Sequence, residues 1–194
     1  MGIGMAVLRW IVGGLFMGHG LQKLAGWFGG HGLQGTGEFF ESALEMKPGK
    51  AHATAAGVAE TGGGALVAAG FATPLGASLI TGAMVTAIRK VHASKGIWNS
   101  EGGFEYNLVL IAALFALSAE GPGALSVDGA LGKRRWGLPW ALGELAAAAL
   151  GSTAAIELGK RAGAGGQAAD TTPPVPAQAP AQADRAEQPV SQSA

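Results

Sequence analysis

The chain contains no cysteine among its 194 residues, and charged residues make up only 13% of it. The absence of cysteine excludes disulfides, thiolate nucleophiles, Cys-ligated zinc and Cys-held iron–sulfur clusters. A soluble domain normally carries about a quarter charged residues, so this charge content, with 48% hydrophobic residues, indicates a membrane protein. Thirteen basic and thirteen acidic residues cancel, and no basic cluster is interleaved with aromatics, so we expect no nucleic-acid binding.

Motifs for metal and nucleotide chemistry are also missing. The four histidines, at positions 19, 31, 52 and 92, share no metal-ligand spacing, and the sequence contains no HExxH motif, Walker loop or nucleophile elbow. We therefore expect no metal site, and nothing specific supports a haem held by paired histidines. Any redox chemistry must come from a ligand or a partner.

Long apolar runs indicate membrane-spanning helices. At 1.5 Å per residue, a helix of about 20 residues crosses a hydrocarbon core of about 30 Å. Thr73-Pro74 makes a tight connection between the second and third runs, which predicts an antiparallel hairpin. The sequence predicts four spans, over residues 4–24, 51–71, 75–91 and 104–119.

Two further segments lie outside these four spans. Residues 26–50 are Gly-rich, and the apolar positions around Phe39 and Phe40 recur at helical spacing, which predicts a short amphipathic helix ending before Pro48. An Ala-rich run over residues 138–158, which contains Glu144 and Glu157, predicts an accessory fifth span.

The domain organisation that we predict has three parts. Residues 1–132 form a four-helix transmembrane domain, residues 133–162 an accessory helix, and residues 163–194 a Pro/Ala/Gln-rich tail that cannot bury enough surface to offset its ordering entropy and stays disordered. The first apolar run lacks a small-residue cleavage pattern, so we interpret it as a retained helix. Five spans would put the N-terminus outside, because nine of the thirteen Lys and Arg residues then lie on the cytoplasmic side.

Small residues at a spacing of four are expected to let spans pack closely in lipid. The sequence contains 34 glycines. Pairs that fit this pattern in the first three spans are Gly14 and Gly18, Gly57 and Thr61, and Gly82 and Thr86.

Ionisable residues within the spans are the first site candidates, because a charge in hydrocarbon costs several kcal/mol unless it is paired or faces water. Arg9, His19 and Lys23 lie on one side of the first span. Glu60 lies about nine residues into the second span, followed by three glycines that permit close approach. It could pair with Arg9, His19 or Lys23 as a structural ion pair, or it could serve as a proton or ligand site.

A second group of polar residues lies where the third and fourth spans should meet. His92 belongs to a basic collar at the end of the third span, while Glu105 and Tyr106 begin the fourth. This mouth is either a layer of salt bridges or the entrance to a polar pocket, and Tyr106 also suits an interface anchor. Asp128 follows the fourth span after a Gly-Pro-Gly turn and should have a partner or face water.

Several of these pieces, in their order along the chain, resemble the DoxX family of small bacterial membrane proteins over residues 5–131. The matching residues are Arg9, residues 16–24 (FMGHGLQKL), Glu60 with its glycines, His92, residues 102–107 (GGFEYN), residues 121–123 (GPG) and residues 126–128 (SVD). The resemblance implies a bundle of four transmembrane helices in a bacterial plasma membrane. The family is similar to the membrane subunit of a thiosulfate:quinone oxidoreductase, which implies electron delivery to quinone, and its members are placed in sulfur or oxidative-stress pathways.

Three hypotheses for function follow. In the first, the chain is a membrane subunit of a quinone-linked redox complex whose polar interior binds a quinone-like molecule, with electrons from a soluble redox partner or a reducing substrate. In the second, it is a scaffold that anchors soluble partners, and its buried charges only fix helix pairing. In the third, it transports a small solute, although no inverted repeat is visible. Self-association into a homo-oligomer is open in all three.

Overall fold

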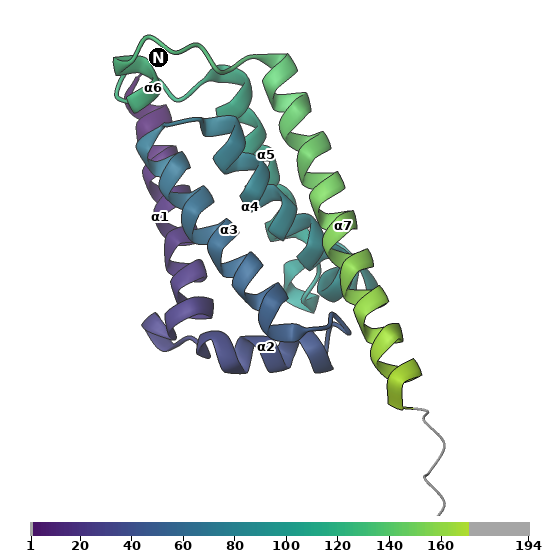
Figure 1. The fold of residues 1–194 in the computed structure, drawn as a ribbon. Coiled ribbons are helices and arrows are strands. Elements are labelled where there is room, and N and C mark those ends of the chain that lie inside the picture. Colours follow the sequence, from purple (N-terminus) through teal and green to yellow (C-terminus); the bar gives the residue numbers. More distant parts are fainter. Residues whose placement is uncertain (1, 171–194) are drawn as a thin grey trace, which may run out of the picture.

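The computed structural model describes residues 2–170, and this part of the chain is all-helical, with no strand. Consecutive long helices run in alternating directions and lie side by side (Figure 1). They are α1 (Ile3–Ala25), α3 (Gly49–Ala69), α4 (Thr73–Ala87), α5 (Glu105–Glu120) and α7 (Leu138–Asp170). Helices are therefore confirmed at all five places where the apolar runs predicted them.

Short elements close the two ends of this array. At the end that is lower in Figure 1, a 3₁₀ turn (Trp27–Gly29) leads into α2 (Gly32–Ser42), which crosses beneath the long helices as the predicted amphipathic helix. The same end holds a π-helical turn that extends α4 (Ile88–His92) and two 3₁₀ turns (Ala93–Lys95 and Asn99–Glu101). The upper end holds α6 (Val127–Ala130) and the loops around it.

The last helix is longer than predicted. α7 begins at Leu138, as expected, but continues to Asp170, so it includes the first residues of the segment that we predicted to be a disordered tail. The rest of that tail, residues 171–194, lies outside the described residues. In the described part of the chain, α1 and α7 are the two helices long and apolar enough to cross a membrane by length and composition.

Glycines determine how closely α1 and α3 approach each other. A Cβ at Gly13 would come within 2.5 Å of the Gly64 carbonyl oxygen, and one at Gly20 within 2.6 Å of the Gly57 carbonyl oxygen. Two antiparallel glycine pairs thus bring the backbones together, as expected for helices that associate through small residues. The prediction for Gly14 and Gly18 is wrong, because a Cβ at either would meet no atom of the chain within 4 Å.

The other two predicted small-residue pairs do lie at helix interfaces. Thr61 packs against Gly20 beside Gly57 in the α1–α3 contact. Gly82 lies against Ala148 of α7, and the Thr86 hydroxyl donates a hydrogen bond to Ser152 Oγ of α7 at 2.9 Å. In a helix of 3.6 residues per turn, the position of a glycine around the axis determines whether it faces α3. A spacing of four residues does not by itself show which side of α1 a glycine pair occupies.

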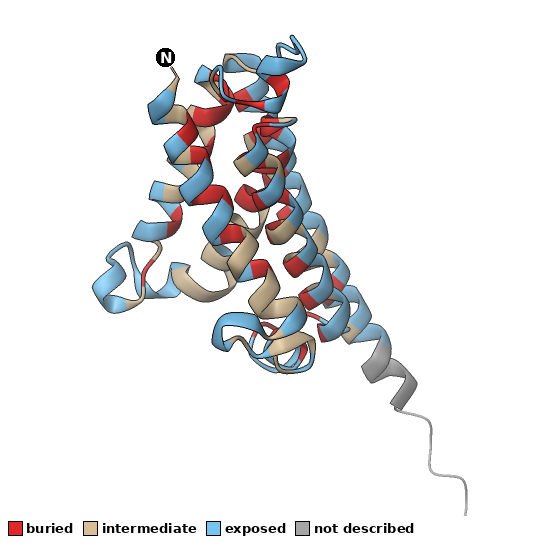
Figure 2. Ribbon diagram, turned by 90° about the vertical axis from the view of Figure 1, so that its left-hand side faces the viewer, coloured by how far each residue is buried: buried red, intermediate tan, exposed pale blue. Residues whose placement is uncertain are grey.

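The interior of the molecule differs between its two halves. The upper half has an apolar core of buried side chains from α1, α3, α4 and α5: Val12, Phe16, Val67, Ala77, Ile80, Leu114 and Leu117. Figure 2 shows wide stretches of only intermediate burial in the lower half. A second, smaller core that includes Phe40, Met46 and Ile156 joins α2, α3 and α7 at the lower end.

Candidate ligand-binding cavity

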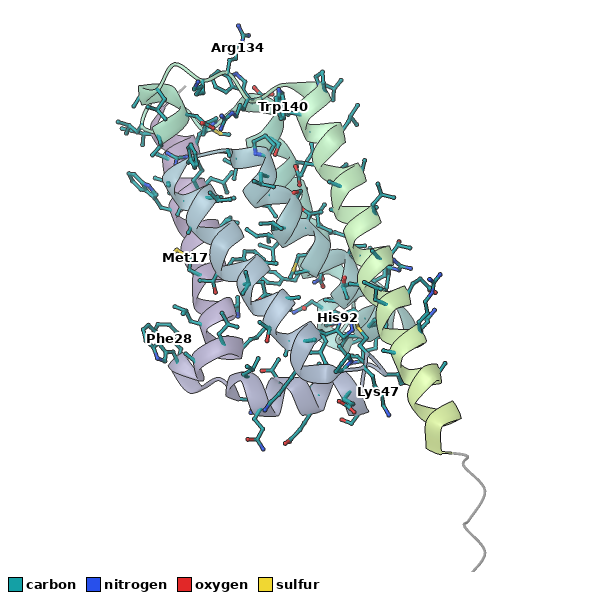
Figure 3. The ribbon with its side chains drawn as sticks, viewed as in Figure 1. Met17, Phe28, Lys47, His92, Arg134 and Trp140 are labelled. Atoms are coloured by element: carbon teal, nitrogen blue, oxygen red, sulfur yellow. The ribbon has the colours of Figure 1, made fainter. Side chains whose placement is uncertain are left out.

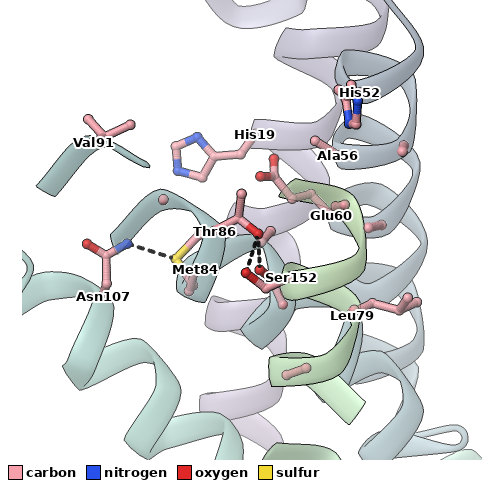
Figure 4. Close-up of a pocket in the computed structure, with 18 of the residues that line it drawn as sticks. His19, His52, Ala56, Glu60, Leu79, Met84, Thr86, Val91, Asn107 and Ser152 are labelled. Atoms are coloured by element: carbon pink, nitrogen blue, oxygen red, sulfur yellow. Dashed lines mark hydrogen bonds between the residues drawn. The ribbon is translucent and has the colours of Figure 1, made fainter. Parts of the chain in front are cut away.

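A cavity of about 640 Å³ occupies the lower half of the molecule, between the two cores. Small and apolar side chains make most of its wall, which suits a predominantly apolar ligand. Figure 4 shows part of the lining, to which α1, α2, α3, α4, α5 and α7 all contribute. The wall formed by α7 consists only of Ala147, Ala148, Gly151, Ser152 and Ala155.

An ion pair lies on the cavity wall between α1 and α3. The Lys23 ammonium donates to Glu60 Oε2 at 2.6 Å, with the Glu60 side chain almost wholly buried and that of Lys23 26% exposed. Lys23 lies one turn beyond Gly20, and the close contact of Gly20 with Gly57 brings that turn of α1 beside Glu60. Of the three cations that we considered as partners for Glu60, the structure therefore brings Lys23 to it.

Two histidines lie on the cavity lining near this pair. His19 is exposed, its Nδ1 lies 2.9 Å from Gln22 Oε1, and its ring packs edge-on against Phe16. His52 of α3 also lines the cavity, and its Nε2 lies 3.2 Å from the Lys47 carbonyl oxygen. In each histidine, one ring nitrogen lies within hydrogen-bond distance of an oxygen that is three to five residues away in the sequence.

The opposite wall comes from α4 and α5. The buried Asn107 amide donates to Met84 Sδ at 3.3 Å, and both residues line the cavity with the half-exposed Tyr106. A thioether is a weak acceptor, so this amide can exchange it for a better one. His92 belongs to the π-helical turn and its Nδ1 lies 2.7 Å from the Gly102 carbonyl oxygen. Of the residues predicted for a polar mouth, His92 and Tyr106 line the cavity.

The polar contact between α4 and α7 forms the remaining part of the wall. Thr86 and Ser152 both line the cavity and share a hydrogen bond. Arg89 donates to Ser152 Oγ at 3.3 Å and to Thr153 Oγ1 at 3.0 Å. The Arg89 guanidinium is therefore hydrogen-bonded to a lining residue, Ser152, but does not itself line the cavity.

The other predicted site residues lie away from the cavity. Arg9 and Asp128 are both fully buried. Asp128 belongs to α6 and Arg9 bonds to the loop just before it, at the upper end of the molecule, where Figure 3 labels Arg134 and Trp140. Glu105 is exposed at the start of α5, where it accepts the Asn99 backbone N–H at 3.0 Å. The structure thus brings together five of the eight predicted residues: His19, Lys23, Glu60, His92 and Tyr106.

Arg9 and Asp128 each bind backbone groups rather than each other. The Arg9 guanidinium donates to the Ala68 carbonyl at 2.8 Å and to the Leu125 carbonyl. Asp128 Oδ2 accepts the Ala72 backbone N–H at 2.8 Å, and its Oδ1 lies 3.5 Å from the Arg135 guanidinium. These bonds tie α1 and the α3–α4 turn to the loop around α6.

Comparison with protein-family models identifies the first part of the chain. The model of the DoxX family matches residues 4–93. This segment belongs to the DoxX family. No curated protein and no solved structure matches the chain.

The DoxX match contains part of the cavity and not all of it. It extends from α1 through the turn after His92, so Lys23, Glu60 and His92 lie within it. Asn107 and the whole α7 wall lie beyond residue 93, although we expected the resemblance to continue to residue 131. In this DoxX protein, residues outside the matched segment therefore complete the cavity.

Sequence reasoning missed part of the lining. Asn107 lies inside the quoted motif of residues 102–107 but is not among the eight candidates, Thr86 enters the sequence analysis only as a packing residue, and Met84 and Ser152 carry no prediction. A buried amide within an apolar run could have identified Asn107, because such a group needs a partner. No spacing along the chain could have identified Ser152, since its place depends on how α7 packs on α4.

Proposed function

We propose that this DoxX protein is the membrane subunit of a quinone-linked redox complex in a bacterial plasma membrane, and that the cavity binds a quinone-like molecule. The observation that supports this most is the combination of an apolar cavity of about 640 Å³ with a buried ion pair on its wall. Ligand pockets are typically about 300–1,000 Å³, apolar, and supplied with a few polar groups that orient the ligand.

The proposal assigns α1, α3, α4 and α5 to a four-helix transmembrane bundle, with α7 as a fifth span. Packing supports this assignment, because α3 and α4 lie against the two apolar helices α1 and α7. In hydrocarbon every backbone polar group must be satisfied internally, which helices achieve.

The polar groups of the cavity are those that quinone chemistry needs. Reduction of a quinone to a quinol consumes two electrons and two protons, and it places negative charge on the two ring oxygens. The Lys23 ammonium and the Asn107 amide are hydrogen-bond donors on opposite walls, and each can donate to one ring oxygen. Glu60 lies against Lys23 and adds a second group that can take part in proton transfer to the ligand.

The electrons come from outside this chain in our proposal. The sequence lacks cysteine, and within residues 2–170 no three His, Asp or Glu side chains converge to hold a metal ion. A soluble redox protein that docks on the membrane surface is the class of partner that would supply both electrons. α2 and the π-helical turn lie at the lower end of the helix array (Figure 1), and their exposed Glu38 and Arg89 are polar groups that such a partner could contact.

Binding of a short-chain quinone to the purified protein in lipid nanodiscs tests the proposal. Lys23→Met removes a charged donor, and loss of such a hydrogen bond costs about 1.5–3 kcal/mol, so the Kd from calorimetry should rise about tenfold or more. Lys160→Met is the matched control, because Lys160 pairs with Glu157 at 3.0 Å on the exposed side of α7. Equal Kd values for the two variants, or no binding by the unmodified chain, would refute quinone binding at this cavity.

A further inference from the structure

Glu144 is a buried acid that the cavity does not use. It belongs to a buried seam of α7 together with Ala141, Ala148 and Ser152, at spacings of three and four residues. The residue is only 2% exposed and lies six positions into α7, roughly 9 Å along the helix. α7 is one of the two helices long and apolar enough to cross a membrane.

The two oxygens of this carboxyl have different surroundings. Oε1 accepts a hydrogen bond from the Thr81 hydroxyl of α4 at 2.7 Å. Oε2 is buried and has no hydrogen-bond partner. The Ser118 hydroxyl of α5 lies beside the same carboxyl, is fully buried, and also has no partner. Two unsatisfied polar atoms from two helices therefore meet at one place.

No cation compensates the carboxyl among the described residues. α4 contains no ionisable residue between Thr73 and Ala87, and those of α5 (Glu105, Tyr106 and Glu120) lie at its two ends. On α7 the nearest ionisable group is Glu157, more than three turns away. Arg89, on the turn after α4, is bound to Ser152 and Thr153.

The upper loop closes the site from above. The Gly137 backbone N–H donates to the Ser118 carbonyl at 3.0 Å, and the Trp136 ring packs on Gly121, where it leaves no room for a side chain. Water that could solvate a carboxylate is thereby kept from this end of the interface. An uncompensated carboxylate in such surroundings costs several kcal/mol.

We propose that Glu144 is a proton-binding site at the interface of α4, α5 and α7. A proton on Oε2 removes a buried negative charge that no ion pair offsets, and the neutral carboxyl can still share a hydrogen bond with the Ser118 hydroxyl. A hard metal cation such as calcium would need six or more oxygen ligands, whereas the three side chains that meet here supply only four oxygens. The proton can leave only when α7 separates from α4 and α5, so proton release is linked to the position of α7.

Infrared spectroscopy of the full chain in nanodiscs at neutral pH tests this site. A protonated carboxylic acid has a C=O stretching band that a carboxylate lacks. We expect this band in the unmodified chain, its loss in Glu144→Gln, and a shift in its frequency in Ser118→Ala. Glu157→Gln, on the exposed side of the same helix, should leave the band unchanged. Absence of the band, or its persistence in a folded Glu144→Gln variant, would overturn the proposal.

Carbodiimide labelling gives a second readout that needs no variant at position 144. Dicyclohexylcarbodiimide reacts with protonated carboxyls in apolar surroundings, so peptide mass spectrometry should locate the adduct on Glu144 and not on Glu120 or Glu157. Labelling that falls as pH rises supports the proton site. Labelling that sodium suppresses at constant pH and ionic strength would replace the proton with a metal cation. Neither experiment involves a quinone, so the outcome is independent of the proposed function.

Discussion

The upper and lower ends of the molecule use the same kinds of side chain in different ways. At the upper end, Arg9 and Asp128 are buried without contact to the cavity and bind backbone groups of distant segments. At the lower end, Lys23 and Glu60 bind each other on the wall of a cavity. The contacts of Arg9 and Asp128, with Arg135 as a further partner of Asp128, join distant segments of the fold. In our proposal the pair at the lower end, which lies beside open space, binds the ligand.

The largest effect that we expect comes from the upper end. Arg9→Leu leaves the Ala68 and Leu125 carbonyls without their donor. An unsatisfied buried acceptor costs about 1–3 kcal/mol, so the two together should lower the free energy of unfolding by about 2–6 kcal/mol. Denaturation of the purified protein in micelles measures this. The comparison of the two ends fails if Arg9→Leu unfolds like the unmodified chain but no longer binds quinone.

A smaller effect should come from the seam between α1 and α3, which supports both ends. Gly20→Ala places a Cβ within 2.6 Å of the Gly57 carbonyl oxygen, and such overpacking costs about 1–3 kcal/mol of unfolding free energy. Gly18→Ala is the control, because its Cβ meets no atom of the chain within 4 Å. The same micelle denaturation should show little or no loss for Gly18→Ala, and equal losses would contradict the assigned seam.

The smallest change in stability should come from the lower pair. The double substitution Lys23→Met with Glu60→Gln removes both charges together, and replacing a buried ion pair by neutral residues is often close to neutral, so we expect a change within about 1 kcal/mol. Quinone binding should nevertheless be lost. If this variant unfolds as readily as Arg9→Leu, the pair is structural and the two ends do not differ.

Much of the fold could be predicted from the sequence, because strong apolar periodicity and turn residues define its helices. The hairpin of α3 and α4 follows from Thr73-Pro74, and α1 and α5 begin and end within a few residues of their predicted limits. The extension of α7 past residue 162 was not foreseen. The Ala-rich composition of α7 favours helix, but the Gly, Gln and Pro residues after position 162 favour a disordered segment, so the sequence predicts that the helix ends there.

The site was less predictable, because it depends on how helices pack. The sequence identified Glu60 as a residue in need of a partner but could not choose among three cations, since that choice depends on the register of α1 against α3. Arg9 lies on the same side of α1 as Lys23, yet it meets the upper loop. Glu144 could have been recognised from its spacing to Ala141, Ala148 and Ser152, which places an acid on the packed side of a helix.

The central claim is that the lower cavity binds a quinone-like ligand beside Lys23 and Glu60. Photo-crosslinking tests it most directly, with a quinone analogue that carries a diazirine, in nanodiscs, and peptide mass spectrometry to locate the adduct. We predict adducts on lining residues such as Phe16, Met84 and Asn107, suppressed by excess unmodified quinone and much weaker in Lys23→Met at the same quinone concentration. Adducts confined to outward-facing residues such as Trp10 and Leu15, with no competition by quinone, would contradict the claim.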